Sequence, residues 1–389
     1  MKSLKTFCLL ALLAPALPGL LVRARQAHFN AQAQRASSCR DCHQQIFDSY
    51  TGTAHFNTSS PAAGQTIKGD FSGGHHLLRT RSESVFFKLE RRADGFYQTG
   101  HAAQKEVRSE RFDLALGSGR KGQSYLFWKD GLLYQLPVSW LVGTRQWINS
   151  PGYEDGKINF DRVITPRCLE CHATSFKLER TPNSVRYTSD YELGIACQKC
   201  HGDGRQHAAH HTAHTEEKAG KFILNLARFS RERQLDNCAL CHSGMRELRR
   251  PPFTYRPGEA LDDYLQPAPE RETASADVHG NQIALLRRSR CFQQSQMSCA
   301  TCHNVHRPER ELTPMAAKCL QCHQTGQCKT GQRLGARMTA NCIDCHMPNQ
   351  KSRLIVIDAP AGKFAPEYRS HLIGVYPQVA KQIMQTLKQ

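Results

Sequence analysis

The pentapeptide CRDCH, residues 39–43, is the first of seven copies of one pattern: two cysteines separated by two residues and followed at once by a histidine. In this pattern the two thiols bond to the vinyl groups of a porphyrin and the histidine ligates its iron, so each copy predicts one covalently attached haem c. The other copies are CLECH at 168–172, CQKCH at 197–201, CALCH at 238–242, CATCH at 299–303, CLQCH at 319–323 and CIDCH at 342–346.

Other uses of paired cysteines do not explain the seven histidines. Zinc ribbons, thioredoxin-like redox motifs and disulfides need the cysteines, but none of them needs a histidine directly after every pair. We therefore predict seven haem c groups, each held by two thioether bonds and one proximal histidine. The predicted thioether cysteines are Cys39, Cys42, Cys168, Cys171, Cys197, Cys200, Cys238, Cys241, Cys299, Cys302, Cys319, Cys322, Cys342 and Cys345, and the predicted proximal ligands are His43, His172, His201, His242, His303, His323 and His346.

The first residues have the layout of a secretory signal peptide. Lys2 and Lys5 precede an apolar stretch at 6–22, and Arg23 and Arg25 follow it. We predict that residues 1–24 direct export to the periplasm or the cell exterior, with an uncleaved membrane anchor as the alternative. No later apolar run in the sequence approaches the roughly eighteen residues that cross a bilayer.

The chain is strongly basic, with 52 lysines and arginines against 34 aspartates and glutamates. Seven haems would add about fourteen propionates, which ionise like other carboxylates and offset most of this excess. We therefore interpret the positive charge as counter-charge for the cofactor, and we expect no binding of nucleic acid.

The motifs are unevenly distributed along the chain. No motif lies between Cys42 and Cys168, and this gap contains two aromatic-rich stretches, 85–100 and 124–140. Each stretch is broken by Asp-Gly, which predicts a β-hairpin. Apolar residues recur at helical spacing only in two later segments, which predicts longer helices at 216–233 and 377–388.

The expected fold is mainly α with little regular structure, organised around seven covalent haems, because haem would supply much of the core. We expect a small antiparallel β insertion near residues 80–165. The predicted division is a first haem segment at 37–80, the β-hairpin insertion at 81–165 and a six-haem core at 166–389.

The second axial ligand of each iron decides what the protein can do. A haem with histidine on both faces can only exchange electrons, whereas a five-coordinate haem can bind a small substrate. His306 follows His303 by three residues, so we expect it to point toward a neighbouring haem. The candidate distal ligands are His55, His76 (or its neighbour His75), His207, His211, His279, His306 and His371. They are enough to give each of the seven haem irons a second histidine ligand.

Two cysteines lie outside both the leader and the motifs, Cys291 and Cys328. In an oxidising compartment the default prediction is a disulfide between them. The alternative is a free thiol close to a haem.

The stretch CRDCHQQIFDSYTGTAH, residues 39–55, resembles the cytochrome c-554 type of multihaem cytochrome. In that pattern an aromatic residue and then a Ser or Thr-x-His follow the attachment motif, so the resemblance implies these roles for Tyr50 and His55. HGDGRQH at 201–207 and CHMP at 345–348 resemble the wider group that contains pentahaem nitrite reductase and octahaem hydroxylamine oxidoreductase. The Cys-x-x-Cys-Lys motif of the nitrite reductase catalytic haem does not occur in this sequence.

We therefore predict an exported seven-haem electron carrier with mostly bis-histidine haems and redox proteins as its partners. The alternative is a multihaem reductase or oxidase that acts on a small nitrogen or sulfur compound at one five-coordinate haem. Arg120, Lys121 and Tyr125 would bind such an anion if the β region folds over a haem. Assembly into an oligomer or a haem filament, and membrane association through the N-terminus, are further expectations.

Overall fold

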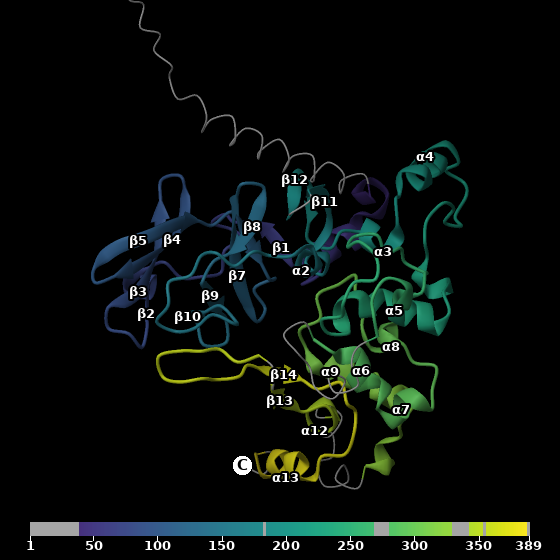
Figure 1. Cartoon of the computed structure of the whole chain (residues 1–389). Coiled ribbons are helices and arrows are strands. Elements are labelled where there is room, and N and C mark those ends of the chain that lie inside the picture. The colour runs from purple at the N-terminus through teal and green to yellow at the C-terminus, as the bar shows by residue number, and fades with distance from the viewer. Residues whose placement is uncertain (1–38, 182–183, 268–279, 329–341, 353–354, 387–389) are drawn as a thin grey trace, which may run out of the picture.

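The computed structural model describes residues 39–181, 184–267, 280–328, 342–352 and 355–386 (Figure 1). The predicted leader and the candidate ligand His279 lie outside these ranges. The strands of the N-terminal half gather on one side of the molecule, and short helices form the other side (Figure 1). None of the helices in the described ranges is long and apolar enough to span a bilayer.

A six-stranded antiparallel sheet forms the centre of the strand-rich side. Its strand order is β1-β6-β7-β9-β10, and β8 pairs with β7 off this path. Its strands are β1 (Ser59–Pro61), β6 (Leu114–Leu116), β7 (Gly122–Lys129), β8 (Leu132–Gln135), β9 (Val138–Leu141) and β10 (Gln146–Asn149).

A second antiparallel sheet of four strands packs beside it, in the simple order β2-β3-β4-β5. Its strands are β2 (Leu77–Arg79), β3 (Val85–Arg92), β4 (Gly95–Ala102) and β5 (Lys105–Arg111).

The two hairpins predicted from Asp-Gly are confirmed as β3–β4 and β7–β8. Asp130 and Gly131, the two residues between β7 and β8, both have positive φ (53° and 75°). This is the conformation of a two-residue hairpin turn, in which Asp-Gly is favoured.

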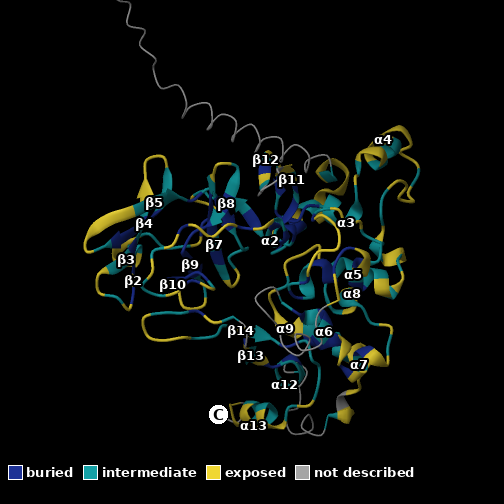
Figure 2. Cartoon of the chain, in the orientation of Figure 1, coloured by how far each residue is buried: buried dark blue, intermediate teal, exposed yellow. Residues whose placement is uncertain are grey.

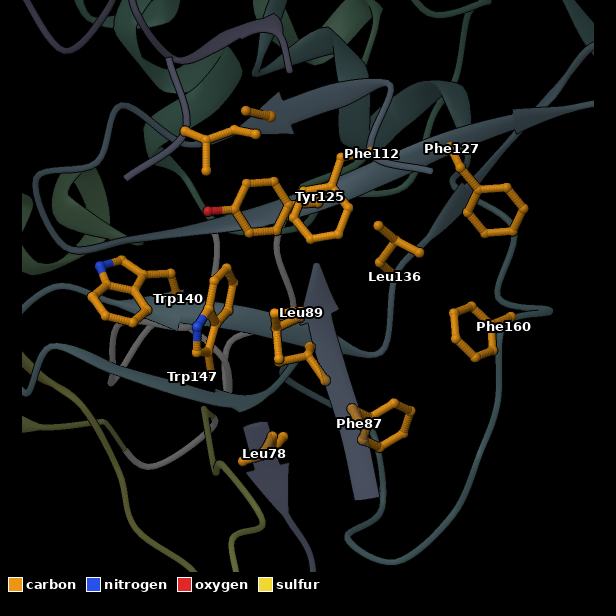
Figure 3. Packing of buried hydrophobic residues seen from close by; sticks show 13 residues of the cluster. Leu78, Phe87, Leu89, Phe112, Tyr125, Phe127, Leu136, Trp140, Trp147 and Phe160 are labelled. Atoms are coloured by element: carbon orange, nitrogen blue, oxygen red, sulfur yellow. The ribbon is translucent and has the colours of Figure 1, made fainter. Parts of the chain in front are cut away.

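Aromatic side chains from both sheets form one apolar core (Figure 3). Phe87 of β3 and Tyr125 and Phe127 of β7 are at most 1% exposed. Burying each side chain of this size contributes about 1.5–3 kcal/mol. This half of the chain therefore has a conventional protein core, made of Leu78, Phe87, Leu89, Phe112, Tyr125, Phe127, Leu136, Val138, Trp140, Trp147, Phe160 and their neighbours.

The prediction of a mainly α chain with a small β insertion is wrong. The strands begin before residue 80 and continue past the second motif, where β11 (Ala173–Thr181) and β12 (Ser184–Leu193) form a hairpin. Phe176 and Leu178 alternate with polar residues and pair with Tyr191 and Tyr187 across it. This period of two specifies a strand even between two haem motifs. A fourth sheet joins β13 (Asn349–Lys351) and β14 (Glu367–Arg369).

The helices are short, and most of them carry or flank a motif. They are residues 39–50, α2 (Pro166–Glu170), α3 (Gln198–His201), α4 (Arg205–Ala213), α5 (Arg231–His242), α6 (Gln282–Arg287), α7 (Arg290–Gln293), α8 (Cys299–Cys302), α9 (Leu312–Ala316), α12 (Cys342–His346) and α13 (Pro377–Thr386). Short 3-10 helices are η1 (Gly73–His76), η2 (Leu226–Arg228), η3 (Leu261–Asp263), η5 (Cys319–Gln321) and η6 (Thr325–Gln327).

Of the two longer helices predicted from periodicity, the C-terminal one is confirmed as α13 and the other is wrong. Between residues 216 and 225 the chain turns without forming a helix, and α5 begins only at Arg231. Ser230 caps α5, because its side-chain oxygen accepts a hydrogen bond from the backbone N–H of Arg233.

Buried residues are spread unevenly over the two sides of the molecule (Figure 2). No residue from 198 to 234 is buried, although this segment contains Phe222, Leu224, Leu226 and Phe229. The protein core of this side is a cluster around α5, η3 and α6 that includes Leu235, Leu261 and Ile283, and it does not extend into residues 198–234.

Candidate haem-binding site

One large cavity connects all seven motifs. Its volume is about 4920 Å³, whereas a pocket for a single small ligand has roughly 300–1,000 Å³. Every cysteine and histidine of the seven motifs lines it, except Cys168. The cavity thus has the place and the extent that a set of neighbouring porphyrins would require.

Five of the exposed apolar side chains on this side line the cavity. Ile46, Val305, Leu312, Leu320 and Val375 are 36–79% exposed, and all five line the cavity. Large apolar side chains at the wall of a cavity favour an apolar occupant. The lining therefore fits flat apolar groups, as porphyrin faces are.

Four of the seven proximal histidines are oriented by hydrogen bonds to their Nδ1 atoms. His201 donates to the carbonyl of Leu224 (2.8 Å) and His346 to that of Gly374 (2.7 Å). His172 hydrogen-bonds to Thr58 Oγ1 (2.9 Å) and His303 to Glu309 Oε2 (2.9 Å). A hydrogen bond at Nδ1 directs Nε2 away from the protein, which is the arrangement of a metal-ligating histidine.

Four motif histidines each face a second histidine from elsewhere in the chain. Two imidazoles that bind one metal from opposite sides, each through a nitrogen about 2 Å away, have ring centres about 6 Å apart. The four observed separations match this value. The pairs are His43 with His207 (6.2 Å), His242 with His55 (6.1 Å), His201 with His306 (5.9 Å) and His303 with His371 (6.3 Å).

Burial keeps two of these facing histidines neutral. Desolvation, with a smaller effect of nearby histidines, lowers the pKa of His55 and of His371 to about 4. Neutral imidazole is the form that binds a metal, so both side chains are ready to act as ligands at physiological pH.

The remaining candidate distal ligands are placed differently. His75 and His76 lie in η1, outside the cavity, and the His76 ring bonds to the carbonyl of Gly73. His211 lines the cavity, but its ring lies against His207 (4.7 Å) and its Nε2 accepts from the backbone N–H of Lys221.

The cysteines show which motifs are neighbours. Three thiol pairs are in hydrogen-bonding contact, and they join the first motif to the third, the second to the fourth and the fourth to the fifth. Asn237, next to Cys238, donates to the Cys200 thiol and so joins the third motif to the fourth. The pairs are Cys39 with Cys197, Cys171 with Cys241 and Cys238 with Cys299.

The last three motifs are also close to one another. Burial and the neighbouring thiols of Cys342 and Cys302 raise the pKa of Cys319 to about 11. The sixth motif therefore lies close to both the fifth and the seventh.

A buried ion pair fixes the second motif against α5. Arg167 and Glu170 lie 3.0 Å apart with side chains only 7% and 3% exposed. Arg167 also donates to the carbonyl of Leu240 in α5 (2.8 Å), and Glu170 accepts from the backbone N–H of Phe253 (2.6 Å). Sequence reasoning missed this pair, although a Glu inside the motif and an Arg just before it were a visible signal.

Other supporting residues were also missed. Thr58 and Glu309 orient proximal histidines, and only Glu309 lies near its motif in sequence. Tyr50, expected as the aromatic residue of the first motif, donates to the carbonyl of Ile195 (2.7 Å) and so ties that motif to the third.

Cys291 and Cys328 are free thiols, so the predicted disulfide between them is wrong. Each lies beside a different motif: Cys291 is near Cys302, and Cys328 is near Cys342 and Cys345. The alternative prediction, thiols close to haem motifs, describes their positions.

Comparison with known proteins agrees with this geometry. Residues 149–202 match the family described as cytochrome c554 and c-prime, and this segment contains the second and third motifs. The match confirms the resemblance seen in the sequence and identifies covalently bound haem c as the cofactor. No curated protein sequence matches the chain.

Two solved structures are similar to the chain. The crystal structure of the outer cell wall cytochrome OcwA is 16% identical, with a TM-score of 0.54 over 89% of this chain and 80% of that chain. The undecaheme cytochrome from the S-layer of Carboxydothermus ferrireducens is 14% identical, with a TM-score of 0.39 over 90% of this chain and 59% of that one. The similarity to OcwA shows that the chain has a multihaem cytochrome fold.

Proposed function

Because the chain has a multihaem cytochrome fold, we propose that it is an exported electron carrier that holds seven covalent haem c groups. The observation that carries the proposal is the single cavity in which all seven motifs meet and four motif histidines face a second histidine. The similar structures are of proteins described as outer cell wall and S-layer cytochromes, which supports a place outside the cytoplasm.

The four histidine pairs define sites suited to electron transfer. A haem iron with histidine on both faces exchanges single electrons and has no open position for a substrate. His43, His201, His242 and His303 would bind from the motif side. His55, His207, His306 and His371 would close the opposite faces, and their rings are positioned without any change in the fold.

The neighbour relations among the motifs suggest a path for electrons. It runs from the first motif to the third and fourth, and then to the fifth, sixth and seventh. The second motif branches from the fourth through Cys171 and Cys241. We propose that redox partner proteins exchange electrons at the ends of this path and at the branch.

Substitution of the facing histidines tests the proposal. Changing His55, His207, His306 or His371 singly to Ala should convert one low-spin haem to high spin in the oxidised, haem-loaded protein. His76→Ala is the matched control, because His76 lies outside the cavity, and it should leave the spin state unchanged. Low-spin spectra unaffected by all four substitutions, or fewer than seven haems in the intact mass, would contradict the proposal.

A second candidate function is favoured by the last two motifs. Within the described ranges, no histidine ring faces His323 or His346, although both line the cavity. If either iron has an open face, the chain would act as a reductase or oxidase on a small nitrogen or sulfur compound. Spectral titration of the oxidised protein with nitrite, hydroxylamine and sulfite tests this, and a fully low-spin protein whose spectrum does not respond would exclude it.

A further inference from the structure

The loop between β6 and β7 is held rigidly at the edge of the cavity. Gln123, which is 4% exposed, donates to the carbonyls of Thr66 (3.0 Å) and Gly117 (3.1 Å). Its side-chain oxygen accepts from the backbone N–H of Lys68 (2.8 Å). One buried amide thus fixes both the loop and the segment that carries Lys68.

Glycines let the loop turn sharply and let Lys68 lie across it. Gly117 and Gly119 have φ of 109° and 76°, which other residues rarely adopt. A Cβ on Gly119 would lie 2.5 Å from Cγ of Lys68, so the lysine side chain needs a glycine beneath it.

Three cations gather at this point, and none of them has an ion-pair partner in the part of the chain that the structure describes. Lys68, Arg120 and Lys121 are exposed, all three line the cavity, and no carboxylate of the described residues forms an ion pair with any of them. The backbone N–H groups of Ser118 and Gly119 also lack an acceptor among the described residues. Free N–H groups beside cations form a concavity that binds anions.

The loop is directly connected to the second motif. The backbone N–H of Gly117 donates to the carbonyl of Thr58 (2.7 Å), and the hydroxyl of Thr58 hydrogen-bonds to Nδ1 of His172. On the other side of this motif, Cys171 contacts Cys241 of α5. Helix α2 therefore lies between α5 and the sheet that carries the loop (Figure 1).

This placement matches the chemistry of a porphyrin. The vinyl groups that bond to the cysteines lie on one edge of the ring, and the propionates lie on the opposite edge. Cys171 faces α5 and Cys168 packs against the strand-side cluster of Leu114, Leu126 and Leu133, so a haem at this motif would lie between α5 and the sheet, in the cavity that the cationic loop also lines. Tyr125, which the sequence grouped with Arg120 and Lys121, is buried in the sheet core, where its hydroxyl donates to Gln123 Oε1 (3.2 Å), so it supports the loop and does not face the anion.

We propose that Lys68, Arg120 and Lys121, with the N–H groups of Ser118 and Gly119, form a binding site for a carboxylate or small oxyanion beside the second motif. The intended ligand is the propionate pair of the haem at Cys168 and Cys171, so the proposal rests on the proposed haem content. The alternative ligand with the same negatively charged oxygen atoms is a diffusible oxyanion such as nitrite or sulfite. The positive side chains of Lys68, Arg120 and Lys121 would raise the reduction potential of that haem, because they stabilise the additional negative charge of the reduced state.

The test compares the haem-loaded variant Arg120→Gln/Lys121→Gln with the wild-type protein in a potentiometric titration in anion-free buffer. We expect about a tenfold fall in the equilibrium constant for reduction of one haem, which is a downward shift of about 59 mV for a one-electron couple. Lys105→Gln/Lys129→Gln is the control, because it removes the same charge from exposed sites of the sheets outside the cavity. It should leave the potentials unchanged.

A second arm separates the two sources of the anion. If propionate is the ligand, the shift appears without added anion, and nitrite and sulfite do not change the wild-type potentials. If a diffusible oxyanion is the ligand, nitrite or sulfite shifts the wild-type potential saturably but not that of the variant.

Two results would overturn the site: no difference in either arm, or an equal shift in the control variant. The intact mass distinguishes this failure from failure of the proposed function. A mass short of the haem at Cys168 and Cys171 counts against the proposed haem content, whereas a full haem content without a shift counts against the loop site alone.

Discussion

The two sides of this molecule are stabilised in different ways. From β1 to β12 the chain buries its own aromatic residues, and Phe87, Tyr125 and Phe127 are almost completely inaccessible. From residue 198 to 234 no residue is buried, and the buried cluster of the helical side, around Leu235 and Leu261, is smaller than the core of the sheets. The sheets therefore carry an extensive core of their own, whereas the helical side combines a small protein core with a large cavity that haem would fill.

Removal of the haems should give the largest effect. In the full-length chain made without haem attachment, we expect proteases to cut first within residues 198–234, where no residue is buried, and to cut last within residues 59–193, which hold the larger apolar core. Mass spectrometry of the fragments measures the order of cleavage. Equal resistance of the two segments, with the haem-loaded chain as reference, would contradict this expectation.

A cavity in the sheet core should destabilise the strand-rich side alone. Phe127→Ala removes a side chain that is 1% exposed, and such truncations cost about 3–5 kcal/mol in the free energy of unfolding. Val107→Ala on β5, where the side chain is 57% exposed, is the control and should stay within about 0.5 kcal/mol. Denaturant unfolding followed by tryptophan fluorescence measures both, and equal midpoints would contradict a core at Phe127.

The junction of the two sides should respond to loss of its buried ion pair. Arg167→Met leaves Glu170 charged and buried, which costs about 3 kcal/mol, and adding Glu170→Leu should recover most of the loss. The control is Asp161→Asn, which breaks an ion pair with Arg108 that is 76% exposed on the aspartate side and costs about 0–1 kcal/mol. A double variant no more stable than Arg167→Met would argue against a desolvated pair.

The smallest effect is expected where the C-terminal segment reaches across to the sheets (Figure 1). The backbone N–H of Asp155 and the guanidinium of Arg81 hold the pKa of Asp358 below its usual value. The contribution of Asp358 to stability is therefore complete above the ordinary carboxyl pKa of about 3.8–3.9 and is lost as the pH falls through its lowered pKa.

The Asp358→Asn variant measures this contribution. It should lower the melting temperature at pH 7 slightly and should match the wild type near pH 2, when both are measured by calorimetry. An Asn variant that loses as much stability at pH 2 as at pH 7 would show that the charge of Asp358 has no role.

The sequence could predict the chemistry of the site better than its arrangement. Each motif is local, so its cysteines and histidine could be read directly, and the same holds for the Asp-Gly turns of two hairpins. The match between motif and facing histidine is a tertiary property. Nothing near His55 indicates that it lies opposite His242, and Thr58 and Glu309 support their histidines through the fold alone.

The mainly α prediction failed for a related reason. The density of motifs after residue 166 suggested that haem would replace regular structure, but the alternating residues of β11 and β12 pair with one another and pack on β7 and β8. Local periodicity therefore outweighed the influence of the neighbouring motifs.

The most direct test of the proposed haem arrangement is the magnetic circular dichroism spectrum of the oxidised, haem-loaded protein, with its iron content determined independently. We expect seven irons per chain, of which at least the four between facing histidines are low-spin with two histidine ligands. Fewer than seven irons, or fewer than four such low-spin centres, would contradict it.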